Sequence, residues 1–372
     1  MRILVTGAKG FVGKNLVAEL RNQSFTEIME FDKDTDITLL DEFARDCDFI
    51  FHLAGINRPE KQEDFMTGNF GFTSELLNKL KKHDNKAPLL ISSSIQAVLE
   101  NPYGQSKKAG EDLIFDYGKE NDVLVYVYRL PNVFGKWCRP NYNSVVATFC
   151  NNIANDLPIQ VNDPTVEMKL VYIDDVIQSF IQKLKNENTN TAEHETFENV
   201  NPVHKVKLGE IVDLIYSFKE SRDTLQIPNL SDAFTKKLYS TYLSYLPKDA
   251  FGYPLKMNVD NRGSFTEFIK SPDRGQVSIN ISKPGITKGQ HWHNTKNEKF
   301  LVVSGEGVIR FRKIDSEEIL EYFVSGEKLE VIDIPVGYTH NIENLGKTDM
   351  VTVMWVNEIF DKEHPDTYYL EV

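Results

Sequence analysis

The first 180 residues alternate short apolar runs with stretches in which apolar residues recur at helical spacing. Each apolar run has the length of a single buried strand, and the intervening stretches have the period of an amphipathic helix. The strand-like runs are Arg2–Val5, Ile28–Phe31, Phe49–Leu53, Leu89–Ser92 and Leu124–Arg129, and the helix-like runs include Val12–Arg21 and Thr73–His83. Regular alternation of this kind predicts a doubly wound parallel sheet with helices on its faces.

The pattern changes in the second half of the chain. Residues 208–246 have mostly helical spacing, whereas residues 254–358 carry short alternating strands separated by Gly and Asn. Examples are Gln276–Ile281, Lys299–Val303, Gly307–Arg312 and Met350–Trp355. This pattern predicts an antiparallel barrel or sandwich. Pro247, Gly252 and Pro254 mark the boundary, so we expect one domain over residues 1–246 and a second over residues 254–372.

Composition and charge narrow the function classes. A length of 372 residues favours two domains, and 41% hydrophobic residues suffice for ordinary cores. A formal net charge of −13 argues against nucleic acid or an anionic membrane as the main partner. The three cysteines form no C-x-x-C pair, and residues 1–20 do not have the pattern of a signal peptide. With no apolar run long enough to span a bilayer, we expect a cytoplasmic protein.

A glycine-rich loop follows the first predicted strand. Gly7, Gly10 and Gly13 lie between that strand and a helix that begins at Phe11 and Val12. Glycine there permits a tight turn and close approach of the backbone to a pyrophosphate, which the helix N-terminus then stabilises. A plain strand–helix turn is the alternative.

The residue after the second strand bears on the choice of nicotinamide cofactor. Asp32 stands where an acidic residue commonly contacts the ribose, which favours NAD. Lys9 in the loop and Lys33 beside Asp32 could instead bind a 2′-phosphate. On balance the sequence favours NADPH.

Tyr103 and Lys107 form a candidate reactive pair. Positions four apart share one face of a helix, so the ammonium of Lys107 can lie near the hydroxyl of Tyr103. A nearby cation would lower the pKa of the tyrosine toward working pH. Ser94, close to the end of a strand, could hold a carbonyl oxygen by a hydrogen bond. A solvated helix face is the alternative for the pair.

Residues 1 to about 245 resemble the extended short-chain dehydrogenase/reductases that act on nucleotide sugars, which have a Rossmann-type fold. The segments that carry the resemblance are the glycine loop, Asp36-Ile37, residues 52–55, Asn69, residues 92–94, Tyr103 with Lys107, and residues 129–135, 157–161 and 171–176. The loop and the resemblance together imply a cofactor-binding set of Gly7, Lys9, Gly10, Phe11, Val12, Gly13, Asp32, Lys33, Asp36, Ile37, Leu53, Ala54, Tyr103 and Lys107.

The resemblance also implies roles for individual residues. Tyr103 would be the general acid, Lys107 would tune it and Ser94 would anchor the carbonyl. Asn132 would lie near the substrate. Lys136 and Arg139 are our own candidates for binding a diphosphate, with a solvated loop as the alternative.

The chain departs from this family where carbon-acid chemistry would be expected. Members that dehydrate sugars carry Asp-Glu after the anchoring residue, where this chain has Ile95-Gln96. The branch that epimerises and reduces in one site has a cysteine where this chain has Gln96. The first domain is therefore predicted to transfer hydride without an epimerase base of its own.

Three histidines and one glutamate near the end of the chain have the types and spacing of metal ligands. His291 and His293 alternate along a predicted strand and so face one side of it, and neighbouring strands supply Glu298 and His340. Three imidazoles and one carboxylate suit a borderline divalent ion, and we expect Zn²⁺. Histidines on a solvated strand face are the alternative.

The spacing of these ligands resembles both motifs of the cupin family, over roughly residues 254–370. The second motif departs only at its leading Gly, where Leu329 stands. Residues 260–267 also resemble a segment of the sugar-nucleotide 3,5-epimerase cupins, which are metal-free. A metal can polarise a sugar ketone and make the adjacent C–H removable. Four residues are open candidates for the base, namely Tyr338, Lys288, Lys296 and His364.

The whole chain resembles bifunctional enzymes of capsular polysaccharide synthesis. That resemblance implies a cupin that epimerises C3 of a UDP-4-keto-6-deoxy-N-acetylhexosamine with Zn²⁺, and a first domain that reduces C4 with NADPH. The implied product is UDP-2-acetamido-2,6-dideoxy-talose, and the implied assembly is a homodimer. Two alternatives remain: a nucleotide-sugar reductase or 4-epimerase with a non-catalytic cupin, or a metal oxygenase or sugar isomerase with a structural first domain.

Overall fold

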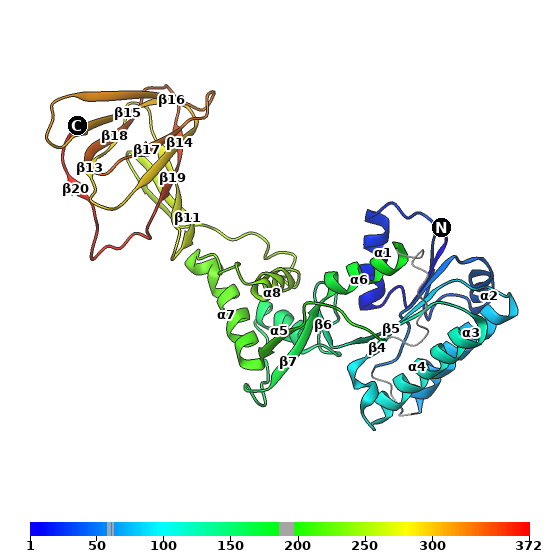
Figure 1. Ribbon diagram of the computed structural model, residues 1–372. Coiled ribbons are helices and arrows are strands. Elements are labelled where there is room, and N and C mark those ends of the chain that lie inside the picture. Colours follow the sequence, from blue (N-terminus) through cyan, green and yellow to red (C-terminus); the bar gives the residue numbers. More distant parts are fainter. Residues whose placement is uncertain (58–60, 62, 186–196) are drawn as a thin grey trace. The chain divides into compact units, whose positions relative to one another are not determined.

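The computed structural model describes residues 1–57, 61, 63–185 and 197–372, and these residues form two compact units. The first unit comprises Met1–Tyr216 and Leu230–Pro247, and the second comprises Ser217–Asn229 and Lys248–Val372 (Figure 1). Residues 217–229, which the sequence analysis places in the first domain, belong to the second unit. They do so because the backbone of Lys270 exchanges hydrogen bonds with Leu225 and Ile227, each 2.8 Å long.

The first unit is built on a six-stranded parallel sheet in the order β2-β1-β3-β4-β5-β8. The strands are β1 (Ile3–Thr6), β2 (Ile28–Phe31), β3 (Phe49–His52), β4 (Leu89–Ser94), β5 (Val125–Leu130) and β8 (Phe197–Glu198). The chain leaves β1 for β2 on one side and then returns to β3 on the other. The strand order therefore reverses between β1 and β3, and such a point is where open α/β sheets bind ligands.

Helices cover both faces of this sheet, and each face has its own apolar core. On one face α1 (Phe11–Asn22) and α6 (Ile173–Lys185) bury side chains such as Leu16 and Phe180. On the other face α2 (Ile37–Asp46), α3 (Phe72–Lys82) and α4 (Pro102–Asn121) bury Leu40, Leu77 and Ile114. Every residue of β1 and β3 is buried, because helices cover both faces of the sheet at these strands.

A smaller lobe completes the first unit. It holds the three-stranded sheet β6-β7-β9 and the helices α5, α7 and α8, of which α7 continues into the second unit. The elements are β6 (Asn132–Phe134), β7 (Glu167–Tyr172), β9 (His204–Lys207), α5 (Val145–Ala154), α7 (Leu208–Thr224) and α8 (Ala233–Leu243).

The second unit consists mainly of two antiparallel sheets, with strand orders β10-β11-β12-β19-β14-β17 and β16-β15-β18-β13-β20 (Figure 1). The strands are β10 (Met257–Asp260), β11 (Gly263–Ser271), β12 (Gly275–Ser282), β13 (Thr287–Trp292), β14 (Glu298–Ser304), β15 (Glu306–Lys313), β16 (Ile319–Ser325), β17 (Val331–Ile334), β18 (Tyr338–Asn344), β19 (Met350–Val356) and β20 (Tyr368–Tyr369). Phe300 and Val302 of one sheet share a buried core with Phe311 and Ile342 of the other. The predicted fold class, a Rossmann-type domain followed by an all-β cupin domain, is confirmed.

Within the residues that the structure describes, no helix combines the length and the apolar character needed to cross a membrane.

Candidate active site and metal centre

The glycine loop lies at the point where the strand order reverses. Gly7 follows β1 with φ +70°, a conformation that favours glycine, and a Cβ there would lie 2.7 Å from the backbone nitrogen of Ala54. A Cβ on Gly13 would lie 2.1 Å from the carbonyl oxygen of Gly7. Glycine is therefore required for the close packing of this loop, and Leu53 and Ala54 after β3 lie against it.

The first turn of α1 is open to an anion. Gly10 is the N-cap residue, and no side chain caps this helix. Phe11 and Val12 begin the helix and pack partly against the core, which fixes its N-terminus beside the loop. Uncapped N–H groups and the helix dipole favour a bound phosphate. The residues present thus fit a dinucleotide pyrophosphate.

Asp32 and Lys9 are held close together beside this loop. The carboxylate of Asp32 accepts hydrogen bonds from the backbone N–H groups of Lys9 at 2.7 Å and Lys33 at 2.8 Å. The side chain of Lys33 is exposed. The ammonium of Lys9 forms an ion pair with Asp34, and this hydrogen bond raises the pKa of Lys9. Asp34 therefore competes for the cation that the sequence analysis assigns to a 2′-phosphate.

Asp36 and Ile37 start α2. The carboxylate of Asp36 caps the helix by accepting from the N–H of Thr38 at 2.9 Å, and this bond lowers the pKa of Asp36. Ile37 is an exposed apolar side chain in the first turn. Ile37 is thus available to contact an adenine, whereas the Asp36 side chain has a structural role already.

Ser94, Tyr103 and Lys107 come together at the end of β4. Ser94 ends the strand, and its side chain hydrogen-bonds Tyr103, in the first turn of α4. Burial raises the pKa of Tyr103, and the hydrogen bond with Ser94 acts in the opposite direction. The sequence analysis expects Lys107 to lower this pKa, but only burial and Ser94 contribute to it, and burial has the larger effect.

The ammonium of Lys107 lies between β4 and the segment that follows β3. It donates to the carbonyl oxygen of Ser92 at 3.3 Å and lies 3.1 Å from where a Cβ on Gly55 would be. Burial lowers the pKa of Lys107 to about 8, with the charge of Glu111 opposing that shift. A cation with a pKa near working pH can tune a proton donor beside it.

Glu111 is a buried carboxylate one helical turn beyond Lys107, and the sequence analysis did not single it out. It is fully buried, accepts a 2.6 Å hydrogen bond from the hydroxyl of Ser93 and forms an ion pair with Arg129. The guanidinium of Arg129 in turn lies 3.8 Å from the ring centre of Phe197. This network ties α4 to β4 and β5 directly beneath the reactive pair.

The three substrate-binding candidates lie on and after β6. Asn132 is exposed at the start of that strand. Lys136 forms an ion pair with Asp174, 2.5 Å long, and the guanidinium of Arg139 lies 5.3 Å from the ring centre of Tyr142. Lys136 therefore has a partner on α6 and Arg139 has one in the loop after β6, and their contact with a diphosphate stays a prediction.

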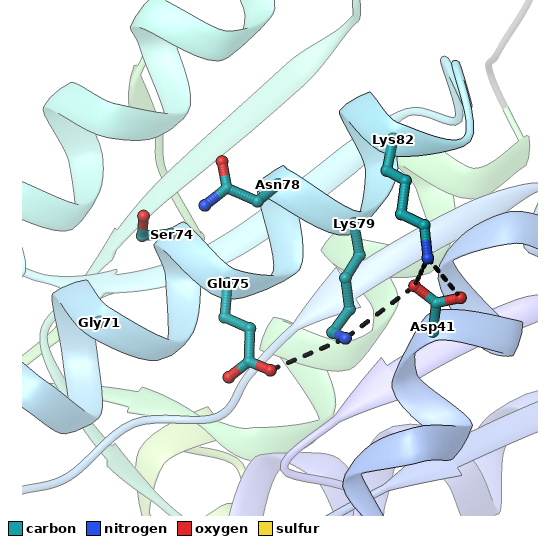
Figure 2. A pocket seen from close by; sticks show the side chains of 7 residues that line it. All are labelled: Asp41, Gly71, Ser74, Glu75, Asn78, Lys79 and Lys82. Atoms are coloured by element: carbon teal, nitrogen blue, oxygen red, sulfur yellow. Dashed lines mark hydrogen bonds and ion pairs between the residues drawn. The ribbon is translucent and has the colours of Figure 1, made fainter.

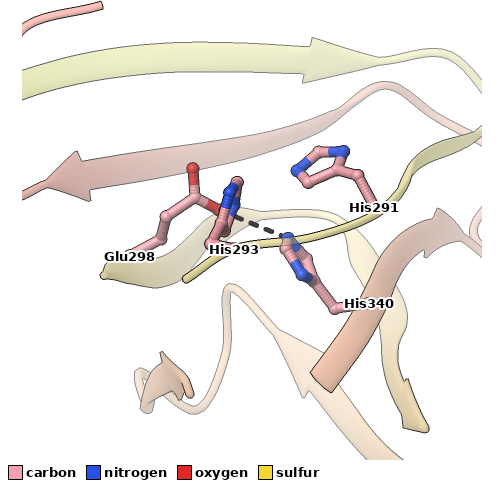
Figure 3. A group of neighbouring side chains, drawn as sticks. All are labelled: His291, His293, Glu298 and His340. Atoms are coloured by element: carbon pink, nitrogen blue, oxygen red, sulfur yellow. Dashed lines mark ion pairs between the residues drawn. The ribbon is translucent and has the colours of Figure 1, made fainter. Parts of the chain in front are cut away.

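The four metal-ligand candidates converge in the second unit. One ligand atom from each of His291, His293, Glu298 and His340 lies within 4.8 Å of the others (Figure 3). Nε2 of His340 is 3.2 Å from Oε2 of Glu298, and Nε2 of His293 is 3.5 Å from the same oxygen. His293, Glu298 and His340 are buried, and His291 is half-buried.

The electrostatics of this cluster fit a divalent cation. Nε2 of both His293 and His340 and Oε2 of Glu298 are buried without a hydrogen-bond partner. Burial alone would raise the pKa of Glu298, but the imidazoles of His293 and His340 beside its carboxylate hold that pKa well below its usual range. Burial, reinforced by the neighbouring His340, lowers the pKa of His291 to about 4. Neutral imidazoles and an ionised carboxylate are the forms that bind a borderline divalent ion.

The four base candidates lie in different surroundings. The ammonium of Lys296 is 3.8 Å from Oε1 of Glu298, beside the cluster. That of Lys288 donates to Asn280 and to the carbonyl oxygen of Ile281, each at 2.8 Å. Tyr338 packs partly against the apolar core. His364 is exposed and lies 3.2 Å from Asp361.

Two further features escaped the sequence analysis. Gln276, Ser278 and Asn280 are buried on one face of β12, so this strand turns its polar side inward. The alternation of polar residues was visible in the sequence, but alternation alone suggests the opposite orientation. Asp366, far along the chain, contacts His293 through its backbone oxygen, and no local pattern marks it.

A pocket in the first unit lies along α3 beside α2 (Figure 2). It is lined by Asp41, Gly71, Ser74, Glu75, Asn78, Lys79 and Lys82. Asp41 pairs with Lys82 at 2.9 Å and with Lys79 at 4.0 Å. None of the lining residues was predicted to belong to a site.

Comparisons with known proteins agree with both halves of this description. Residues 3–197 match the NAD dependent epimerase/dehydratase family, and residues 258–368 match the polysaccharide biosynthesis C-terminal domain. A Pseudomonas aeruginosa protein named UDP-2-acetamido-2,6-beta-L-arabino-hexul-4-ose reductase is 45% identical over 372 residues, covering 100% of this chain and 99% of that relative.

Solved structures show a likeness over the entire chain as well. The capsular polysaccharide assembling protein CapF from Staphylococcus aureus is 59% identical, with 100% of both chains covered and a TM-score of 0.93. A UDP-glucuronic acid 4-epimerase from Bacillus cereus shares the fold alone, at 20% identity and a TM-score of 0.55 over 66% of this chain and 98% of its own. The chain therefore belongs to the NAD dependent epimerase/dehydratase family, as a member that carries a polysaccharide biosynthesis C-terminal domain and is similar to CapF over its full length.

Proposed function

We propose that the protein is a bifunctional nucleotide-sugar enzyme of capsular polysaccharide biosynthesis. The cupin unit epimerises C3 of a UDP-4-keto-6-deoxy-N-acetylhexosamine, and the first unit then reduces the C4 ketone. The product is UDP-2-acetamido-2,6-dideoxy-talose. The observation that carries the proposal is the presence, in one chain, of a Ser94–Tyr103–Lys107 arrangement and a buried three-histidine, one-carboxylate cluster.

The reduction would use the first unit. The glycine loop would hold NADPH, which would supply hydride for reduction of the C4 ketone. Ser94 would hold the ketone oxygen by a hydrogen bond, and the hydroxyl of Tyr103 would donate the proton that completes the alcohol. Lys107 would keep a positive charge beside the tyrosinate that remains. The name of the Pseudomonas aeruginosa relative, a reductase of a UDP-linked hexul-4-ose, supports a ketone at C4 of the substrate.

The epimerisation would use the second unit. A divalent ion, most suitably Zn²⁺, would supply Lewis-acid polarisation of the C4 carbonyl and so acidify the C3 proton. His291, His293, Glu298 and His340 would hold the ion. Among the four base candidates, Lys296 has the most suitable position, because its side-chain nitrogen lies beside Glu298, and in its neutral amine form it would accept the C3 proton. Removal of the C3 proton and its return on the other face of the ring invert that carbon without a change in oxidation state.

The separation of the two steps explains the residues that the first unit lacks. Ile95 and Gln96 offer no carboxylate or thiol next to Ser94, so this site has no group there to remove a carbon-bound proton. The second unit, which has buried polar side chains and the His/Glu cluster, would supply the removal of the C3 proton instead. The alternative is a nucleotide-sugar reductase or 4-epimerase in which the cupin is a non-catalytic binding or assembly module.

The deciding experiment follows the C3 proton in D₂O. The full chain is incubated with the 4-keto sugar nucleotide without NADPH, and NMR records exchange at C3. We expect exchange in the wild type and in Tyr103→Phe, and none in His291→Ala or after removal of the metal. Exchange that persists in verified metal-free protein would favour the alternative. Product NMR after adding NADPH tests the talose configuration, and light scattering tests the predicted homodimer.

A further inference from the structure

The carboxylate of Asp366 binds the turn that follows the first two histidine ligands. It accepts hydrogen bonds from three successive backbone N–H groups, those of Asn294 at 3.0 Å, Thr295 at 2.7 Å and Lys296 at 2.9 Å. Burial alone would raise the pKa of Asp366, but these N–H groups hold it well below its usual range. Three donors on one carboxylate fix the turn relative to Asp366.

The backbone of the same residue contacts a metal-ligand candidate. The carbonyl oxygen of Asp366 lies 2.5 Å from Nδ1 of His293. Because a carbonyl oxygen only accepts, Nδ1 must carry the hydrogen, and the lone pair is then on Nε2. Nε2 is buried without a hydrogen-bond partner and is 3.5 Å from Oε2 of Glu298. The contact therefore places a free lone pair inside the cluster.

The residues after Asp366 hold both strands that carry the histidines. Tyr369 of β20 pairs with His291 of β13. The N–H of Leu370 donates to the carbonyl oxygen of Gln290 at 3.0 Å, and the hydroxyl of Thr339 on β18 donates to the carbonyl oxygen of Leu370. We call residues 366–372 the clasp. It connects β13, β18 and the turn after His293.

We propose that Asp366 is a positioning residue for the metal centre. Its carboxylate holds the turn after His293, and its carbonyl oxygen thereby selects the His293 tautomer whose Nε2 faces the other ligands. This inference rests on the metal centre of the proposed function and adds to it a residue outside the ligand set. Backbone carbonyls that accept from the second nitrogen of a ligating histidine commonly fix its orientation and raise metal affinity.

The competing explanation is that Asp366 only stabilises the fold. A purely structural residue would change the unfolding temperature but leave metal affinity and geometry unaltered in the folded protein. The measurements must therefore report on the metal and on the imidazole, not on turnover.

Zinc affinity in the full chain provides the first test. Apo protein is titrated in competition with a chromophoric chelator, and the same proteins are titrated with Co²⁺ to record the d–d spectrum. Asp366→Ala should weaken zinc binding by about 10- to 100-fold and change the Co²⁺ spectrum. The zinc affinity of Asp366→Asn should lie between those of the wild type and Asp366→Ala, because asparagine keeps one acceptor oxygen. Asp361→Asn is the matched control: Asp361 is exposed and accepts from the N–H of Glu363 and lies beside His364, so its substitution should leave both readouts unchanged.

The tautomer of His293 provides the second test. This measurement uses protein with an unchanged Asp366, so it does not depend on whether Asp366→Ala folds. Long-range ¹H–¹⁵N spectra of metal-free, ¹⁵N-histidine protein should show His293 protonated at Nδ1, with assignment among the eight histidines from a His293→Gln sample. Wild-type zinc affinity and spectra retained in folded Asp366→Ala, or a His293 protonated at Nε2, would overturn the inference. A wild-type protein that binds no zinc would instead contradict the metal centre of the proposed function.

Discussion

His291 on β13 lies directly opposite His340 on β18, with ring centres 4.6 Å apart. This pairing depends on a bulge, since Gly289 pairs with Asn341 and the next paired residue is His291, which leaves Gln290 as the extra residue. Without the bulge, His291 would lie opposite Thr339. Gly289 has φ +105° and Gln290 has φ +67°, so both residues of the bulge have left-handed backbones.

Gly289→Ala is expected to damage the metal centre. A Cβ there would lie 2.8 Å from the carbonyl oxygen of His340, so the backbone of a ligand strand must shift. We expect zinc affinity to fall at least tenfold, and the free energy of unfolding to fall by about 1–3 kcal/mol. Gly285→Ala is the control, because its φ is also positive, +72°, but a Cβ there meets nothing within 4 Å. Equal zinc affinity in the two variants would contradict this account.

Tyr103→Phe should abolish ketone reduction while leaving the cupin step intact. Only the hydroxyl is removed, and with it the proton donor that Ser94 contacts. Loss of a general acid lowers the rate by about 10² to 10⁴-fold. The measurement is NADPH oxidation with the 4-keto sugar nucleotide, and C3 exchange in the same sample serves as the internal control. Oxidation near the wild-type rate would remove Tyr103 from the mechanism.

Lys107→Met should be inactive in reduction yet more stable than the wild type at pH 7. Burial lowers the folded-state pKa of Lys107 to about 8 from 10.5, so below pH 8 the folded protein contains a charge that burial disfavours. Between pH 8 and 10.5 the unfolded state binds more protons than the folded state, and wild-type stability rises with pH. The advantage of the variant should therefore shrink across that window. Urea unfolding at several pH values, with Lys108→Met as the exposed control on α4, tests this; an advantage that grows above pH 8 would have the wrong sign.

Glu111→Gln should strongly destabilise the first unit. The substitution leaves Arg129 without its carboxylate partner in a buried pair, and breaking such a pair typically costs about 3–5 kcal/mol. Glu120→Gln on the same helix removes only a surface partner of Lys81 and should cost less than about 1 kcal/mol. Unfolding in urea compares the two, and similar losses would show that the Glu111 network contributes little.

The cofactor is expected to be NADPH, and the Lys9–Asp34 pair offers a way to test the reason. Lys9→Ala should reduce kcat/KM for NADPH more than for NADH. Asp34→Asn frees the Lys9 ammonium for a 2′-phosphate and should improve the KM for NADPH. Wild-type kcat/KM for NADH equal to or above that for NADPH would overturn the preference.

Local sequence patterns determined the elements of this protein and the choice of most of its candidate site residues. Gly7, Gly10 and Gly13 follow a strand and open a helix, and this spacing together with Asp32 after the next strand predicts a tight turn suited to a phosphate. Tyr103 and Lys107 share a helix face because a helix has 3.6 residues per turn. The spacing of His291, His293 and Glu298 along adjacent strands predicts a common cluster. In each case the repeat of the helix or strand decides which side chains share a face, so the spacing of the residues in the sequence is enough to predict that they lie together.

Only the tertiary structure decided which distant residues contact the candidate site residues and how their pKa values shift. Asp366 and His293, Glu111 and Arg129, and Lys9 and Asp34 meet because distant segments pack together, and no local period relates their positions. The bulge at Gln290 shifts by one position the residue that lies opposite His340. The alternation of polar and apolar residues in the sequence does not reveal that β13 contains this extra residue. The pKa values of Tyr103 and Lys107 likewise depend on burial, which the spacing of the two residues does not contain. Contact and burial are properties of the folded chain, because both depend on which remote segments exclude water from a given side chain.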